Sequence, residues 1–141
     1  MADRSRRTTM EAPFTFINTY AVKEGQLEGL RQFLQELFKV LEANEPRLLA
    51  INAYLNQEGT EVAIVQIHPD AASIKDYWRV VHQHTGRALG EFLEGPTSVQ
   101  VYGAPGELVL ERTRHSAGSG IAVSLKPRHL GGLTRLAAAA G

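Results

Sequence analysis

Residues 14–44 read FTFINTYAVKEGQLEGLRQFLQELFKVLEAN, and this stretch contains the two patterns that decide the fold. Phe14–Val22 is aromatic, β-branched and alternating, which predicts a strand. After a turn at Lys23–Gly25, apolar residues recur at the i, i+3, i+4, i+7 spacing of an amphipathic helix, which reaches Asn44 and is ended by Pro46. The residues of this helical stripe are Leu27, Leu30, Phe33, Leu34, Leu37, Phe38 and Leu41.

The chain downstream of this helix predicts a hairpin, a second helix and two further strands. A turn at residues 57–60 contains a glycine and joins the two hairpin strands. The second helix follows Pro69, is interrupted at Gly86 and ends at Gly95–Pro96. Its apolar residues are Ile74, Tyr77, Trp78 and Val81, then Leu89, Phe92 and Leu93. The predicted strands are Arg47–Asn56, Glu61–His68, Thr97–Tyr102 and Glu107–Glu111.

The element order β-α-β-β-α-β predicts an α+β protein with a ferredoxin-like sandwich, in which two helices cover one face of a four-stranded antiparallel sheet. Both faces of the hairpin strands are substantially apolar: Ile51 and Ala53 alternate with Ala50 and Tyr54. A sheet face exposed to water should be polar, so the second face needs a cover. We expect another copy of the chain to provide it, which would give a homodimer through the open sheet face and a dimeric α+β barrel.

Composition divides the chain into three parts. Residues 1–12 are expected to be a disordered leader, residues 13–111 the folded domain, and residues 112–141 a C-terminal extension. In the extension, Ser116–Gly120 has the composition of a flexible linker, and Ile121–Leu125 alternates like a short strand. Two interpretations of this tail stay open: it crosses onto a partner subunit, or it is disordered.

Several functional classes are excluded or disfavoured by composition. The chain of 141 residues has no cysteine, which excludes disulfides, thiolate catalysis and zinc–thiolate sites. No apolar run approaches the ~20 residues of a membrane span, and the basic, polar N-terminus is not a secretory signal, so we expect a cytoplasmic protein with no membrane partner. We assign no metal ligand and no cofactor.

Charge is unevenly distributed along a chain whose net charge is zero. Residues 1–10 carry +2 and residues 111–141 carry +4, which leaves −6 between them. Basic ends can be nucleic-acid-binding arms, or they can lie on the acidic body of their own or a partner chain. The basic residues are dispersed and have no aromatic residues among them, which favours the second interpretation and no nucleic-acid partner.

Polar residues within apolar faces are the candidate site residues, because a buried polar group costs free energy unless it is hydrogen-bonded. Asn18 shares a strand face with Phe16 and Tyr20, and either ties down backbone or lines a pocket. His84 continues the helical stripe of Tyr77 and Val81, and could be a general base, a haem ligand or a core histidine.

His68 ends the third strand on the face of Ile64 and Gln66. Since the first and third strands can be neighbours in a small sheet, Asn18 and His68 could share one pocket.

With Asn18 on the first strand, Glu45–Pro46 before the second strand and His84 on the second helix, residues 14–103 resemble the antibiotic biosynthesis monooxygenase-like family of dimeric α+β barrels. That family includes cofactor-independent quinone-forming monooxygenases, and its superfamily also includes haem-degrading enzymes. Asn18 matches the family's strand asparagine, and His84 matches its helix histidine. His68 takes the place of the family's tryptophan, and the chain's one tryptophan, Trp78, lies in the helix instead.

The resemblance implies a pocket between sheet and helices in which Asn18, His68 and His84 are the catalytic candidates. The residues expected to contact the ligand are Phe16, Tyr20, Tyr77, Trp78 and Val81. The implied activity is a cofactor-independent monooxygenase acting on an aromatic or quinol-like small molecule. Two alternatives stay open: a dimer that binds a small apolar molecule, such as haem, without turnover, and a purely structural dimeric protein.

Overall fold

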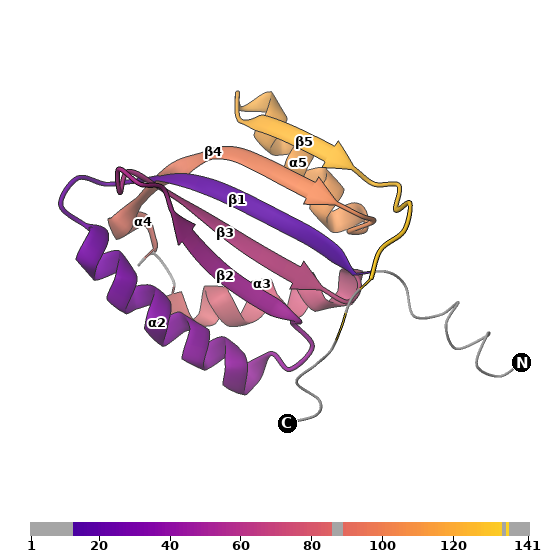
Figure 1. The fold of residues 1–141 in the computed structure, drawn as a ribbon, viewed down its shortest axis with the longest axis horizontal. Coiled ribbons are helices and arrows are strands. Elements are labelled where there is room, and N and C mark those ends of the chain that lie inside the picture. The colour runs from indigo at the N-terminus through magenta and orange to yellow at the C-terminus, as the bar shows by residue number, and fades with distance from the viewer. Residues whose placement is uncertain (1–12, 86–88, 134, 136–141) are drawn as a thin grey trace, which may run out of the picture.

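Strands and helices follow one another as a doubled β-α-β unit, and two further elements extend it at its C-terminal end (Figure 1). The computed structural model describes residues 13–85, 89–133 and 135. The leader predicted over residues 1–12 and the interruption predicted at Gly86 lie outside these described residues. The elements are β1 (Phe14–Val22), α2 (Leu27–Asn44), β2 (Ala50–Leu55), β3 (Glu61–His68), α3 (Ala71–Thr85), α4 (Leu89–Phe92), β4 (Leu93–Tyr102), α5 (Glu107–Gly118) and β5 (Ala122–Lys126).

The strands form one five-stranded sheet with the order β2-β3-β1-β4-β5. Strand β1 pairs antiparallel with β3 and β4, and β2 pairs antiparallel with β3. The order of the first four strands confirms the predicted ferredoxin-like sandwich. Strand β5 joins β4 in parallel, and α5 supplies the crossover that a parallel pair requires.

Alternation along the strands divides their residues between two faces. On β1 and β3, Phe14, Phe16, Val62 and Ile64 are buried, and each is followed by a less buried neighbour. The register pairs Asn18 with Ile64, so both point to the buried face at the middle of the sheet. This face is the one covered by the helices (Figure 1).

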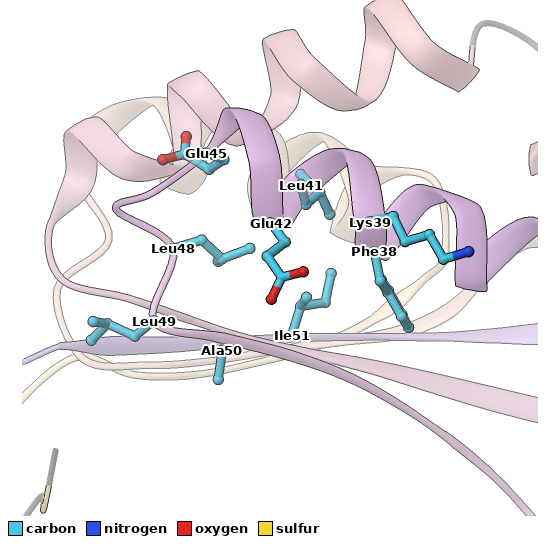
Figure 2. Close-up of a pocket in the computed structure, with 9 residues that line it drawn as sticks. All are labelled: Phe38, Lys39, Leu41, Glu42, Glu45, Leu48, Leu49, Ala50 and Ile51. Carbon is cyan, nitrogen blue, oxygen red and sulfur yellow. The ribbon is translucent and has the colours of Figure 1, made fainter. Parts of the chain in front are cut away.

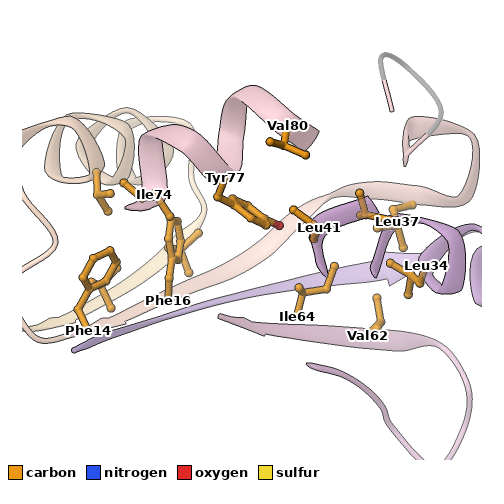
Figure 3. Close-up of a cluster of buried hydrophobic side chains, with 14 of the residues drawn as sticks. Phe14, Phe16, Leu34, Leu37, Leu41, Val62, Ile64, Ile74, Tyr77 and Val80 are labelled. Atoms are coloured by element: carbon orange, nitrogen blue, oxygen red, sulfur yellow. The ribbon is translucent and has the colours of Figure 1, made fainter. Parts of the chain in front are cut away.

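Helix α2 provides one side of the core. Its turn of entry contains Gly25 at φ +77°, a left-handed conformation that favours glycine. Leu30, Leu34, Leu37 and Leu41 are buried, as their helical spacing predicts. Figure 3 shows the leucines of α2 packed with side chains of β1, β3 and α3, among them Ile74, Tyr77 and Val80.

The fifth strand predicted over Glu107–Glu111 is wrong, because these residues begin the helix α5. The letters ELVLE fit a strand, but the two buried residues, Val109 and Thr113, are four apart, which is the spacing of a helix. Consequently the domain boundary placed after residue 111 falls inside α5, and part of the expected linker Ser116–Gly120 is helical.

Two other boundaries differ from the prediction. Gly95–Pro96 lies within β4 and does not end a helix, because β4 already begins at Leu93. Its pairing with β1 is irregular there, between Thr19 and Val22, which is where a strand tolerates proline. Strand β2 begins only at Ala50 and forms an edge of the sheet, whereas β3 and β1 are central.

The face of the sheet opposite the helices has no cover within the described part of the chain (Figure 1). Ile17, Val65 and Ile67 from the two central strands lie on it and are half-buried by one another. Tyr54 on the edge strand β2 is 60% exposed. We call this surface, formed by the outward residues of β1, β2, β3 and β4, the open face.

Beyond β5 the described chain turns back past the end of the open face. Residues 128–130, 132 and 133 border a hollow of about 590 Å³ together with Thr15, Ile67 and Tyr102. Leu130 and Leu133 project outward and are 97% and 79% exposed. None of the described helices is long and apolar enough to cross a membrane.

Candidate functional site

A cavity of about 110 Å³ lies between the helix-covered face of the sheet and the helices α2 and α3. Strands β1, β2 and β3 supply its floor, and α2, α3 and α4 its walls. Its lining residues are Asn18, Tyr20, Leu34, Leu37, Phe38, Ile51, Ile64, Gln66, Tyr77, Trp78, Val81 and Leu89. A concave, mostly apolar site with a few convergent polar groups is the usual form of a small-molecule site.

The cavity brings together most of the residues that the sequence predicted to meet. Asn18 lines it from β1, as predicted for a pocket residue. Four of the five residues expected to contact a ligand also line it: Tyr20, Tyr77, Trp78 and Val81. The fifth, Phe16, is 5% exposed and belongs to the hydrophobic core, outside the lining.

His84 is not where the stripe of α3 predicted. It is exposed and borders a different hollow, of about 410 Å³, with Val40, Asn44 and Arg79 among its neighbours. The spacing from Tyr77 gives the direction of a side chain around the helix axis. It does not show how far along α3 the neighbouring elements cover the helix. At His84, about one turn beyond Val80, α2 and α3 border an open hollow.

His68 is fully buried but does not line the cavity. It ends β3 opposite Phe14, and its exposure is 0%. Its ring stacks on Phe14 at 5.1 Å with an interplanar angle of 16°, and meets Tyr77 edge-on at 5.6 Å. Asn18 and His68 therefore do not line one pocket. Gln66 lies between the cavity and the imidazole.

Gln66 is the lining residue that the sequence arguments passed over. It is 3% exposed, and its Oε1 lies 3.0 Å from His68 Nε2. His68 Nδ1 in turn lies 2.8 Å from Ser73 Oγ, in the first turn of α3. The signal was available, since Gln66 interrupts the apolar side of β3 after Val62 and Ile64.

The hydrogen-bond pattern assigns one tautomer to His68. The Gln66 carbonyl oxygen can only accept, so His68 Nε2 carries the hydrogen, and Nδ1 accepts from the Ser73 hydroxyl. Burial lowers the pKa of His68 to about 4, although the nearby carboxylate of Asp70 acts in the opposite direction. The imidazole is neutral at physiological pH.

The two tyrosines of the cavity are hydroxyl donors at neutral pH. Burial raises the pKa of Tyr20, and burial together with the nearby Tyr20 raises the pKa of Tyr77 further. In Figure 3 the Tyr77 ring reaches from α3 across the core toward the leucines of α2. None of the described residues that line the cavity has a charged side chain.

Four polar residues of the lining have side-chain groups with no hydrogen-bond partner among the described residues. These groups are the side chains of Asn18, Tyr20 and Tyr77 and the amide nitrogen of Gln66. Among the described side chains, the one fully enclosed polar atom without a partner is Glu45 Oε2. The unpaired atoms of these four residues therefore keep accessible surface, and the cavity that they line provides it.

The aromatic wall of the cavity is held from outside by α5. The guanidinium of Arg112 lies 3.9 Å from the ring centre of Trp78, a cation–π contact between α5 and α3. Since Trp78 lines the cavity, part of the C-terminal extension supports the candidate site.

A larger hollow of about 400 Å³ lies between the end of α2 and the start of β2 (Figure 2). Figure 2 shows the carboxylate of Glu42 directed into this hollow and that of Glu45 directed away from it. Glu45 is 3% exposed, and its Oε1 accepts a hydrogen bond from the backbone N–H of Arg47. This arrangement places the Glu45 carboxylate in the connection between α2 and β2, where it shapes the turn.

The described residues contain no cluster of metal ligands, and the cavity does not fit a haem. They contain no group of three or more histidine, cysteine, aspartate or glutamate side chains that could hold a metal ion. For haem, His84 is outside the cavity, and both ring nitrogens of His68 are already hydrogen-bonded. The cavity of about 110 Å³ is also too small for the ring system of a porphyrin.

The chain is similar to known proteins in structure, but the searches by sequence found no match. No family model matches the chain, and no curated protein matches it in sequence. Among solved structures, MupZ from Pseudomonas fluorescens is similar over 88% of this chain and 95% of its own, at 16% identity and a TM-score of 0.66. A match of 88% of the chain must include part of the segment after residue 111.

Two other structural neighbours bear on the fold. A dimeric protein of unknown function with a ferredoxin-like fold, from Bacteroides fragilis, is 17% identical over 64% of this chain and 94% of its own, with a TM-score of 0.50. A protein from Bacteroides thetaiotaomicron, provisionally described as an antibiotic biosynthesis monooxygenase, is 19% identical over 60% and 82%, with a TM-score of 0.50. These likenesses agree with the fold that the resemblance implied.

Proposed function

We propose that the cavity binds a small monocyclic phenol or enol, and that the protein oxidises this molecule with O₂ without a cofactor. The observation that carries the proposal is a set of polar groups in an otherwise apolar cavity that have no hydrogen-bond partner among the described residues. They are the side chains of Asn18, Tyr20 and Tyr77 and the amide nitrogen of Gln66. Buried polar groups are normally hydrogen-bonded, so a ligand oxygen is their natural partner.

The roles of the lining residues follow from their chemistry. Asn18 and the two tyrosine hydroxyls donate to the ligand oxygen, and Phe38 and Trp78 contact the ring. The small volume favours one ring over a polycyclic substrate. The direct neighbours in fold include a protein provisionally described as an antibiotic biosynthesis monooxygenase, which supports oxygenation as the reaction.

The proposed reaction balances without an external reductant. The ring carbon opposite the phenol oxygen forms a bond to O₂, and the O–O bond then breaks. One oxygen atom stays on the ring as the second carbonyl of a para-quinone. The other leaves as water with the ring hydrogen and the hydroxyl hydrogen, so four electrons pass from the phenol to O₂. The donors of the cavity stabilise the phenolate from which these electrons come.

Oxygen uptake by the purified full chain with a panel of monocyclic phenols and quinols tests this proposal. We expect equal amounts of O₂ consumed and quinone formed. Asn18→Ala should lower the rate roughly 10²-fold, as removal of an oxyanion donor typically does. Asn44→Ala is the matched control, because Asn44 is an exposed asparagine at the end of α2. An equal rate in Asn18→Ala and the control would contradict the assignment of the site.

A second candidate function is binding without turnover. It is favoured by the described lining, in which the two tyrosines are the titratable groups and neither a histidine nor a carboxylate is present to act as a base. His68 could assist proton transfer only through Gln66. Trp78, the one tryptophan, lines the cavity and reports occupancy by its fluorescence. Quenching by a phenol with no oxygen uptake would select this candidate over the oxygenase.

Self-association through the open face is part of the same proposal. The apolar residues Ile17, Val65 and Ile67 lie there without a cover in the described chain. A structural neighbour with the same fold is dimeric, which supports the pairing of two copies.

A further inference from the structure

Gln66 has two chemically different ends, and the structure uses only one of them. Its Oε1 lies 3.0 Å from His68 Nε2, in the direction away from the cavity. The amide nitrogen has no partner among the described residues, although Gln66 lines the cavity and is 3% exposed. The end of Gln66 that remains available to a ligand is therefore a donor.

The orientation of Gln66 depends on a second hydrogen bond further from the cavity. Ser73 Oγ lies 2.8 Å from His68 Nδ1 and has no other hydrogen-bond partner among the described residues. Because a buried hydroxyl hydrogen needs an acceptor, Ser73 donates to Nδ1, which leaves the imidazole hydrogen on Nε2. With the hydrogen on Nε2, His68 can bond the oxygen of Gln66 but not its NH₂ group. Ser73 thus selects the tautomer, and the tautomer selects which end of Gln66 faces the ligand.

The imidazole has no room to change this arrangement by turning. Phe14 stacks on one face at 5.1 Å, and Tyr77 meets the ring edge-on at 5.6 Å. Both His68 and Ser73 have an exposure of 0%. Because the ring cannot turn, its tautomer determines the orientation of the Gln66 amide.

We propose that His68 and Ser73 are a positioning pair that fixes the NH₂ group of Gln66 toward the cavity, so that the site takes its ligand as an oxygen anion, a phenolate or enolate. This inference rests on the proposed function and names the ionisation state of its ligand. The tyrosine hydroxyls add donors to the same cavity, and the lining residues that the structure describes include no carboxylate.

The side chains around this site keep one protonation state near neutral pH, so a change in binding with pH should come from the ligand. Among the described residues, the titratable side chains are Tyr20 from β1 and Tyr77 from α3 in the lining, and His68 from β3 behind Gln66, with Asp70 close enough to act on His68. The side chains that α2, β2 and α4 present to the cavity are apolar. The tyrosines stay protonated and the histidine stays neutral at physiological pH, so binding should follow the pKa of the ligand.

The probe for the experiment is 4-nitrophenol, whose ionised and neutral forms differ in visible absorption. Trp78 quenching measures occupancy, and absorption measures the ionisation of the bound probe. We expect binding to lower the pKa of the probe by at least about one unit, which is a tenfold preference for the phenolate. Binding of the neutral form with equal or greater affinity would overturn the inference and leave the proposed function standing. Absence of any phenol binding would instead overturn the proposed function.

Variants of the pair separate positioning from packing. Ser73→Ala removes the hydroxyl that selects the tautomer, and the preference for phenolate should fall about fivefold to tenfold, as for one lost hydrogen bond. His68→Phe should abolish the preference, and His68→Gln, which keeps a donor near the position of Nε2, should restore part of it. His84→Ala is the matched control, an exposed histidine outside the cavity.

A spectroscopic readout completes the test. Nitrogen NMR shifts of His68 should show the hydrogen on Nε2 in the unaltered chain and its partial movement to Nδ1 in Ser73→Ala. If Ser73→Ala keeps both the tautomer and the phenolate preference, the positioning role is refuted even if the variant is less stable. A His68→Phe protein that folds and still prefers the phenolate would refute it independently.

Discussion

At the scale of single residues, the arrangement around His68 shows how a polar side chain is accommodated in the core. Burying an imidazole costs free energy unless both nitrogens are hydrogen-bonded. Here Gln66 and Ser73 satisfy both nitrogens, at 3.0 and 2.8 Å. The neutral ring is well accommodated, whereas a protonated ring would lose the solvation of its charge in the buried site.

This asymmetry predicts that the protein loses stability in mild acid. The pKa of His68 is about 4 in the folded chain against 6.5 for the free side chain. Between these values the unfolded chain binds a proton that the folded chain does not, so the free energy of unfolding falls as pH falls from about 6.5 to about 4. The total loss from this group should be about 3 kcal/mol.

Urea unfolding at a series of pH values measures this effect. Carboxylates also titrate at the acid end of the range, so the informative quantity is the difference between the unaltered chain and His68→Gln. The difference should grow with pH up to about 6.5 and then level off. Parallel curves for the two proteins would show that His68 titrates normally in the folded state.

Asn18 and His84 show which site residues the sequence could and could not predict. Asn18 was placed correctly because alternation on a central strand fixes its face, and its neighbours Phe16 and Tyr20 mark that face as buried. His84 was misplaced because helical spacing gives a direction but not the extent of the cover. Gln66 and His68 lie two residues apart on the same face of β3, and alternation alone does not show which of the two reaches the cavity.

At the scale of elements, α5 and β5 depend on a single glycine. Gly106 precedes α5 with φ +93° and ψ 167°, a conformation open almost only to glycine. A Cβ there would lie 2.7 Å from the Cβ of Ala71 at the start of α3. The close approach of these two helix starts brings Arg112 over the ring of Trp78.

Gly106→Ala should therefore destabilise the C-terminal unit. The strained backbone and the contact with Ala71 should together lower the free energy of unfolding by about 1–3 kcal/mol, and Trp78 emission should change as α5 loosens. Gly118→Ala is the control in the same helix, since nothing lies within 4 Å of an added Cβ there. It should change stability by less than about 1 kcal/mol. Equal effects of the two substitutions would show that Gly106 is not a special position.

The elements of the sandwich were more predictable than the extension for a physical reason. The predicted bounds Glu61–His68 agree with β3 because a strand with one buried face has strict alternation between turn signals. In ELVLE, five letters fit both periods, and only the packing of Val109 and Thr113 against the remainder of the fold decides between them. The parallel pairing of β5 with β4 is a non-local contact with no signature in the sequence.

At the scale of the whole molecule, the open face predicts a dimer. Val65 lies at its centre, paired with Ile17 on one side and Asn52 on the other. Val65→Glu would place a charge in the paired interface and should convert the dimer into a monomer, measured by sedimentation at micromolar concentration. Gln32→Glu, on the exposed side of α2, should leave the dimer intact. A monomeric unaltered chain, or a Val65→Glu variant that still pairs, would contradict pairing through this face.

The pleat of β1 assigns adjacent residues to separate tasks. Asn18 points into the cavity, whereas its neighbours Ile17 and Thr19 point to the opposite side of a wall only one strand thick. The ligand and the second subunit would thus contact opposite faces of the same strand, and no side chain would contact both. Substitutions at the even-numbered positions of β1 would change the ligand site, and substitutions at the odd-numbered positions would change the open face. Related proteins could therefore change one property without changing the other.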